Sequence, residues 1–292
     1  MSTMTRRLLS AATVLAVAPA RADWAGLNMP QGVTNLSHEI YDLHMLILWI
    51  CVAIGAVVFG AMIYSLVKYR KSQGAVADTS ILHSDKVEFV WTIIPVVILV
   101  AMAVPAARTL LKIEDTSGSQ LTVKATGYQW QWRYDYLDAG IGFYSRLAET
   151  SNEARQLDSG VDPRTVDNYL LDVDNPLVVP EDTKIRLLLT ANDVIHAWWV
   201  PQLAVKRDAI PGFVNELWFQ ANEPGTYRGQ CAELCGRDHG FMPVVVVVKT
   251  KDEFAAWLKA EQAKTRQAAV ATNATTAQLH ATDDVATLAQ AE

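Results

Sequence analysis

Two long apolar segments restrict what this chain can fold into more than any other feature. Residues 43–67 and 89–107 contain no Asp, Glu, Lys or Arg, over 25 and 19 residues. Each is long enough to cross a hydrocarbon layer of roughly 30 Å as a helix. Neither carries the polar stripe expected of a helix in a water-soluble protein. The sequence therefore predicts a transmembrane helical hairpin, residues 43–107, in which Pro95 and Pro105 are tolerated where a neighbouring helix covers the backbone.

The first 22 residues have the pattern of a secretory signal peptide. Arg6 and Arg7 precede an apolar run at 8–18, and Ala-Arg-Ala follows at 20–22. This run is too short to span a bilayer, which favours cleavage over an uncleaved anchor. We expect residues 1–22 to be removed.

The distribution of positive charge predicts the orientation of the hairpin. The link between the two apolar segments carries Lys68, Arg70, Lys71 and Lys86, whereas residues 23–42 contain no Lys or Arg. Basic links remain in the cytoplasm, so both ends of the mature chain are expected outside. Residues 23–42 would then form an exported N-terminal segment.

The balance of charge narrows the classes of partner. The formal net charge of the whole chain is −6, and loss of the three arginines in 1–22 would leave 22 basic residues against 31 acidic ones. Such a surface argues against nucleic acid and favours cationic partners.

Beyond residue 107 the chain becomes polar and strand-like. Short segments that alternate or concentrate apolar residues lie between Pro- and Gly-containing turns, which is typical of an all-β Greek-key sandwich or barrel. We expect this domain at 108–262, closed by a helix from Lys251, and a surface insertion at 139–167. Residues 263–292 are rich in Ala and Thr, so we expect a disordered or processed tail. The predicted strands are at 120–136, 184–190, 195–200, 215–220, 225–231 and 243–250.

One short stretch of this domain concentrates the side chains that bind soft metals. Cys231, Cys235, His239 and Met242 lie within twelve residues, and the domain's only other histidine is His196. A disulfide across four residues would stabilise little and leaves the histidine and methionine unexplained. A Cys₂His₂ zinc site fits the ligand types but has no use for a thioether. A β-sandwich with Cys, His and Met on one loop and an earlier His is the pattern of copper cupredoxins. The extra cysteine favours two coppers bridged by two thiolates, with the disulfide and zinc sites as alternatives.

These residues also resemble a known family. The segments "GQCAELCGRDHGFMP", "VIHAWWVP" and "KRDAIPG" are similar to those of subunit II of the bacterial haem–copper cytochrome c oxidases. The resemblance covers roughly residues 36–258. It implies a cupredoxin-like domain and places the chain in the bacterial inner membrane, with both termini periplasmic.

The resemblance implies a ligand set for a dinuclear copper centre, CuA. Cys231 and Cys235 would bridge the two coppers. His196 and Met242 would complete one copper, and His239 with the carbonyl oxygen of Glu233 would complete the other. The Glu233 carboxylate would also reach a magnesium ion at the interface with the catalytic subunit, unless it is an ordinary solvated side chain.

The resemblance also implies partners. Cytochrome c would donate electrons through Trp130, and the haem-bearing catalytic subunit I, with further oxidase subunits, would use them to reduce dioxygen. Strand alternation would place Trp130 and Trp132 on one face, so the spacing does not separate a surface tryptophan from a core tryptophan. The acidic residues expected to guide the basic donor are Asp135, Asp174 and Asp193.

Glu88 has two readings. By resemblance it lies at the cytoplasmic mouth of a proton path into the catalytic subunit, whereas the plain reading is a carboxylate near a helix N-terminus. Two other functions remain open for the chain. One is a relative of quinol oxidase subunit II, which the full ligand set opposes, and the other is a periplasmic copper carrier or sensor, which needs no second bridging cysteine.

Overall fold

The computed structural model describes residues 24–76, 80 and 83–267, so the predicted signal peptide and most of the predicted tail lie outside the described residues. Contacts divide the chain into an N-terminal unit that ends at Pro30 and a second unit that begins at Gln31. Within the first unit the described part contains a short helix, α2 (Trp24–Leu27). The second unit contains the hairpin and the sandwich.

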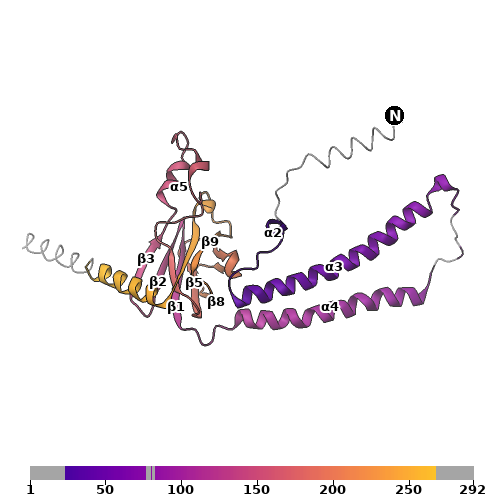
Figure 1. Cartoon of the computed structure of the whole chain (residues 1–292), viewed down its shortest axis with the longest axis horizontal. Coiled ribbons are helices and arrows are strands. Elements are labelled where there is room, and N and C mark those ends of the chain that lie inside the picture. The colour runs from indigo at the N-terminus through magenta and orange to yellow at the C-terminus, as the bar shows by residue number, and fades with distance from the viewer. Residues whose placement is uncertain (1–23, 77–79, 81–82, 268–292) are drawn as a thin grey trace, which may run out of the picture. The chain divides into compact units, whose positions relative to one another are not determined.

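Two long helices form the hairpin (Figure 1): α3 (Asn35–Lys68) and α4 (Asp85–Glu114). Both are long and apolar enough to cross a membrane. A capping box begins α3, because the Thr34 hydroxyl accepts from the Ser37 amide at 2.8 Å and the Ser37 hydroxyl accepts from the Thr34 amide at 3.0 Å. Both helices extend beyond the apolar segments, and α4 continues through both of its prolines. A short 3-10 helix, η1 (Lys71–Gln73), follows α3.

The domain that follows the hairpin is a sandwich of two five-stranded sheets. Their strand orders are β3-β2-β1-β5-β8 and β4-β10-β9-β6-β7. The pairs β1·β5 and β4·β10 are parallel and the remaining pairs are antiparallel. The strands are β1 (Leu121–Tyr128), β2 (Gln131–Tyr136), β3 (Ile141–Ser145), β4 (Leu177–Pro180), β5 (Ile185–Ala191), β6 (His196–Val200), β7 (Val205–Ala209), β8 (Asn215–Phe219), β9 (Gly225–Cys231) and β10 (Pro243–Lys249).

The core lies between the two sheets and follows from strand alternation. In β5 the odd-numbered residues 185–191 are buried and the even-numbered ones are not, as expected for a strand with one face toward a core. Trp198 from the opposite sheet is fully buried and stacks on Phe219, with ring centroids 6.0 Å apart. The C-terminal helix, residues 251–267, packs Phe254, Trp257 and Leu258 against this core.

The structure corrects two expectations about the strands. Residues 120–136 are not one strand but a hairpin, in which Tyr128 of β1 pairs with Gln131 of β2 across a two-residue turn. The segment 139–167 is not wholly a surface loop, because it contributes the edge strand β3, whose Ile141 and Ser145 are buried. It also contains the helix α5 (Glu149–Ala154) and the 3-10 helix η2 (Pro163–Thr165). Four further elements were not expected from the sequence. They are the strands β4 and β7 and the 3-10 helices η3 (Pro201–Leu203) and η4 (His239–Phe241).

Candidate metal centre

Two neighbouring strands and one loop bring the five predicted side-chain ligands together. His196 begins β6 and Cys231 ends β9, and the two strands pair directly where Trp198 faces Cys231. The chain then turns through 232–242 before β10 begins. This loop brings Cys235, His239 and Met242 close to Cys231 and to His196 at the start of β6, so residues far apart in sequence meet where two interior strands of the sheet begin and end.

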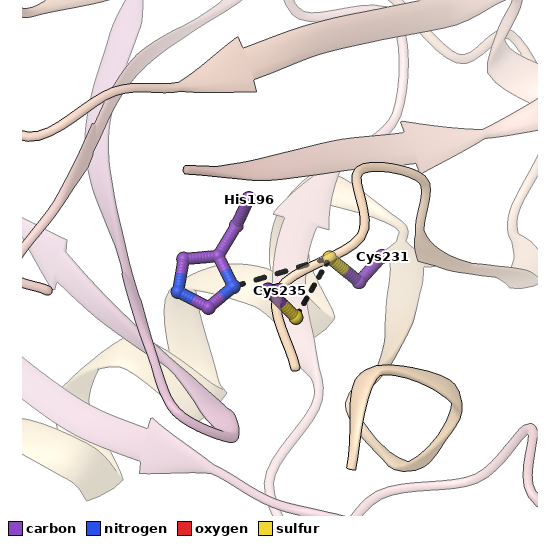
Figure 2. Close-up of side chains that lie close together, drawn as sticks. All are labelled: His196, Cys231 and Cys235. Carbon is purple, nitrogen blue, oxygen red and sulfur yellow. Dashed lines mark hydrogen bonds between the residues drawn. The ribbon is translucent and has the colours of Figure 1, made fainter. Parts of the chain in front are cut away.

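The distances between these side chains are those of a compact cluster. The sulfurs of Cys231 and Cys235 are 3.9 Å apart, and the Nδ1 atom of His196 lies 4.0 Å from the Cys231 sulfur (Figure 2). The Cys235 sulfur is 3.4 Å from Nδ1 of His239 and 3.6 Å from the sulfur of Met242. Five soft or imidazole donors therefore face one another within a single small volume.

A backbone carbonyl also lies at the cluster, and most of the side chains in it are buried. The carbonyl oxygen of Glu233 lies 3.4 Å from the Cys231 sulfur. His196, Cys231, Cys235 and Met242 are buried, and His239 is half-buried. Both cysteines are free thiols in the structure, since bonded sulfurs would be about 2.0 Å apart. Thiolate, thioether and imidazole ligands together fit copper, so the residues present suit the metal that the sequence predicts.

A carboxylate fixes the orientation of His196. Asp193 Oδ1 lies 2.9 Å from His196 Nε2, and the other ring nitrogen, Nδ1, faces the Cys231 sulfur (Figure 2). Metal-binding histidines usually have such a partner, because it holds the tautomer and the ring plane. Gly127 leaves room for the ring, since a Cβ there would come within 2.7 Å of His196 Cδ2. The spacing Asp-x-x-His is the sequence signal for this partner, whereas Asp193 was expected only to guide a donor.

The electrostatics of the cluster call for a cation. Burial acts to raise the pKa of Cys231, but hydrogen bonds from His196 and the backbone outweigh burial and lower it. Burial also acts to lower the pKa of His196, yet Cys231 and Asp193 raise it. Burial raises the pKa of Cys235 to about 12, and negative charge on Cys231 acts in the same direction. The surroundings therefore shift the pKa values of the two thiols in opposite directions, and a bound cation would favour the thiolate form of both.

The structure separates the two tryptophans that alternation left together. Trp130 lies in the turn between β1 and β2 and is half-buried, and its Nε1 donates to the carbonyl oxygen of Cys235 at 3.2 Å. Trp132 is fully buried in β2, and its ring lies edge-on to His196 with centroids 5.9 Å apart. Of these two, only Trp130 reaches both the surface and the ligand loop.

The three acidic residues predicted to guide a donor all have partners within the domain. Arg133 donates to Asp135 through Nε at 3.0 Å and Nη2 at 2.8 Å. Asp174 accepts from the Arg146 amide at 2.7 Å. Asp193 accepts from the Gln129 amide at 2.7 Å, in addition to its contact with His196. The part of each carboxylate in docking stays a prediction.

Glu88 lies in the first turn of α4, as the plain reading expects. Its Oε1 is 2.7 Å from Nδ1 of His83 and accepts from the Ser84 amide at 3.5 Å. Asp85 contacts the other ring nitrogen of His83. No role was expected for His83, although acidic residues follow it at two and five positions further on.

Comparisons with known proteins agree with this architecture. The sequence model described as "Cytochrome C oxidase subunit II, periplasmic domain" matches residues 121–249, and the one described as "Cytochrome C oxidase subunit II, transmembrane domain" matches 22–109. A probable cytochrome c oxidase subunit 2 from Rickettsia bellii is 39% identical over 224 residues, which are 76% of this chain and 79% of the relative.

Two further relatives extend the comparison. Cytochrome c oxidase subunit 2 from Acheta domesticus is 33% identical over 241 residues, 82% of this chain and 98% of the relative. The crystal structure of the periplasmic domain of cytochrome oxidase subunit II from Bradyrhizobium japonicum is 43% identical, covers 51% of this chain and 99% of that domain, and has a TM-score of 0.44. With two membrane helices, a cupredoxin-like sandwich and matches across both parts, the chain belongs to the cytochrome c oxidase subunit II family.

Proposed function

We propose that this chain is the subunit through which electrons enter a cytochrome c oxidase. Cytochrome c is the donor, and the haem-bearing catalytic subunit uses the electrons to reduce dioxygen to water, coupled to proton translocation. The observation that best supports this proposal is the buried cluster of two thiols, two imidazoles and a thioether beside the Glu233 carbonyl.

The residues that would hold copper are divided as the family resemblance implies. Cys231 and Cys235 would bridge, His196 and Met242 would bind one copper, and His239 with the Glu233 carbonyl would bind the other. A copper pair held by these residues would supply one-electron transfer. The chain's own contribution is to hold the ligands together and to keep water away from four of the five side chains.

Trp130 is the proposed point at which electrons reach the domain. Its hydrogen bond to the Cys235 carbonyl joins a half-buried ring directly to the backbone of a proposed ligand. Acidic residues near this face, with Asp135, Asp174 and Asp193 as the predicted set, would guide a basic donor by long-range attraction even where short-range partners occupy them.

A second face is proposed to meet the catalytic subunit. The side chain of Leu234, between the two cysteines, is 78% exposed, and Ile195, next to His196, is 43% exposed. Exposed apolar side chains beside a functional site are typical of a protein interface. The Glu233 carboxylate, also exposed, would bind magnesium at this interface, and Glu88 would open a proton path at the other end of the hairpin.

The proposed orientation places this face outside the cytoplasm. The basic link between α3 and α4 would remain in the cytoplasm and the sandwich would lie in the periplasm. The proposed sequence of domains is a signal peptide (1–22), an exported segment (23–42), the hairpin (43–107), the copper domain (108–262) and a tail (263–292). Helix 251–267 crosses the last of these boundaries.

The test uses the full chain in detergent, titrated with copper and followed by electron paramagnetic resonance. We expect two coppers per chain and one unpaired electron shared between them. Cys235→Ser should abolish the shared signal, whereas Cys51→Ser, in α3, should preserve it. Zinc binding without colour, or a Cys231–Cys235 disulfide that persists under reducing conditions, would contradict the proposal.

The rate at which cytochrome c reduces the copper-loaded chain distinguishes an electron-transfer subunit from a copper carrier. A copper carrier or sensor should not accept electrons rapidly from cytochrome c. Trp130→Phe should slow this reduction while the copper spectrum is unchanged, and Trp257→Phe, on the C-terminal helix, should leave the rate unaltered. An unchanged rate in Trp130→Phe would remove Trp130 from the proposed route.

A further inference from the structure

The N-terminal half of α5, in the insertion at 139–167, is hydrogen-bonded to the segment that precedes β4. The Ala148 amide donates to the Asp172 carbonyl at 3.0 Å, and the Ser151 hydroxyl accepts from the Leu170 amide at 3.1 Å. Ser151 and Ala154 are buried. Arg155 follows this helix, and its amide donates to the carbonyl oxygen of the buried Ser151 at 3.1 Å, so its backbone is tied to the same turn.

Arg155 reaches from this insertion to the ligand loop. Its Nε donates to Asn152 Oδ1 at 2.8 Å, which sets the plane of the guanidinium. Its Nη1 lies 3.5 Å from Asp238 Oδ1, and its Cζ lies 4.3 Å from the ring centroid of Phe241. The Arg155 and Asp238 side chains are 22% and 18% exposed, so this contact is mostly sheltered from water.

The two residues of the ligand loop that Arg155 contacts, Asp238 and Phe241, each directly precede a proposed ligand. Asp238 is followed by His239, and Phe241 is followed by Met242. The Phe241 amide donates to the Asp238 carbonyl at 2.9 Å, so both contacts fall on one turn of chain, η4. The Arg155 guanidinium therefore contacts both ends of the turn that carries His239 and Met242, and shares Asp238 Oδ1 with Arg237 Nε, also at 3.5 Å.

We propose that Arg155 is a positioning residue for the copper centre, acting through Asp238 and Phe241 on His239 and Met242. This inference rests on the proposed function. An arginine suits the role because its planar guanidinium hydrogen-bonds Asn152 and forms an ion pair with Asp238 while its face covers the ring of Phe241. A lysine would keep the positive charge but could not contact Asn152, Asp238 and the Phe241 ring at once, because it lacks the planar guanidinium.

The experiment compares Arg155→Met and Arg155→Lys with Arg164→Met in the full chain in detergent. Arg164 lies in the same insertion and pairs with Asp162, and its side chain is 90% exposed. The first readout is the rate at which a chelator removes copper, together with the paramagnetic resonance spectrum. The second, made without metal, is hydrogen exchange at the His239 and Phe241 amides, both of which donate to backbone carbonyls.

We expect copper loss from Arg155→Met to be about 10-fold faster or more, as for other changes to groups that orient ligands. Both amides should exchange faster, and the resonance spectrum should change. Arg155→Lys should restore little of the wild-type behaviour, and Arg164→Met should match the wild type. Equal thermal unfolding temperatures would show that the effect is local.

Copper loss and exchange in Arg155→Met that match Arg164→Met would overturn the inference. If Arg155→Met does not fold, Arg155→Lys carries the test, and wild-type rates in that variant would overturn it equally. If the wild-type chain binds no copper pair, the proposed function fails on that result alone. Hydrogen exchange in the metal-free chain would still decide whether Arg155 holds the turn.

Discussion

The hairpin and the sandwich are both rich in aliphatic residues, yet they cover these side chains in opposite ways. In the hairpin, Val57 of α3 is 72% exposed and Leu99 of α4 is 63% exposed. In the sandwich, Val244 and Val246 of β10 are fully buried. The helices depend on lipid to cover their surface, whereas the sheets supply a core of their own. The same substitution should therefore have different consequences in the two regions.

The largest effect is expected from a pair of tryptophan substitutions. Trp198 is fully buried and its Nε1 donates to the Tyr134 hydroxyl at 3.1 Å, so Trp198→Ala should cost the sandwich about 3–5 kcal/mol of unfolding free energy. Trp91 in α4 is 61% exposed, so Trp91→Ala should change the unfolding free energy of the sandwich by no more than about 0.5 kcal/mol. Denaturant unfolding, followed by the near-ultraviolet signal of the sandwich, measures both. Equal costs would mean that the two regions unfold as one unit.

A charge placed in the hairpin tests the other side of the comparison. Val57→Asp puts a carboxylate near the middle of an apolar span and should oppose insertion by about 3 kcal/mol. Val76, in the link after α3, is 92% exposed, and Val76→Asp should insert normally. The fraction of chain that resists alkaline extraction from membranes gives the result. Normal insertion of Val57→Asp would contradict the assignment of α3 as a membrane span.

The two regions also differed in how far the sequence predicted them. The absence of charge from 43–67 was sufficient for α3, because a membrane helix is defined by length and hydropathy. The site was predictable because Cys231 to Met242 are close in sequence and chemically distinctive. The predictions that failed were those that depend on tertiary structure. Nothing local shows that the chain turns at 129–130, so Trp130 and Trp132 were not separated, and edge strand β3 was hidden in a segment of polar composition.

An effect of intermediate size, on copper affinity, is expected from a substitution of Asp193, which orients His196. Asp193→Asn should weaken copper binding about 10- to 100-fold, because the amide is a poorer partner for His196 Nε2 than the carboxylate. Asp252→Asn, on the exposed face of the C-terminal helix, is the matched control. Competition with a chelator of known affinity measures both variants. If Asp193→Asn binds as the wild type does and is reduced more slowly by cytochrome c, Asp193 serves docking and not ligand orientation.

The smallest effect is expected from an ion pair on the surface of the sandwich. Arg186 of β5 and Glu216 of β8 form a salt bridge with side chains 39% and 41% exposed, and such pairs contribute roughly 0.2–1 kcal/mol. A double-mutant cycle with Arg186→Gln and Glu216→Gln should give a coupling in that range. The register of these strands is held instead by the buried pair Leu187 and Leu217. A coupling above about 2 kcal/mol would mean that polar contacts, and not the buried face, hold the sandwich in register.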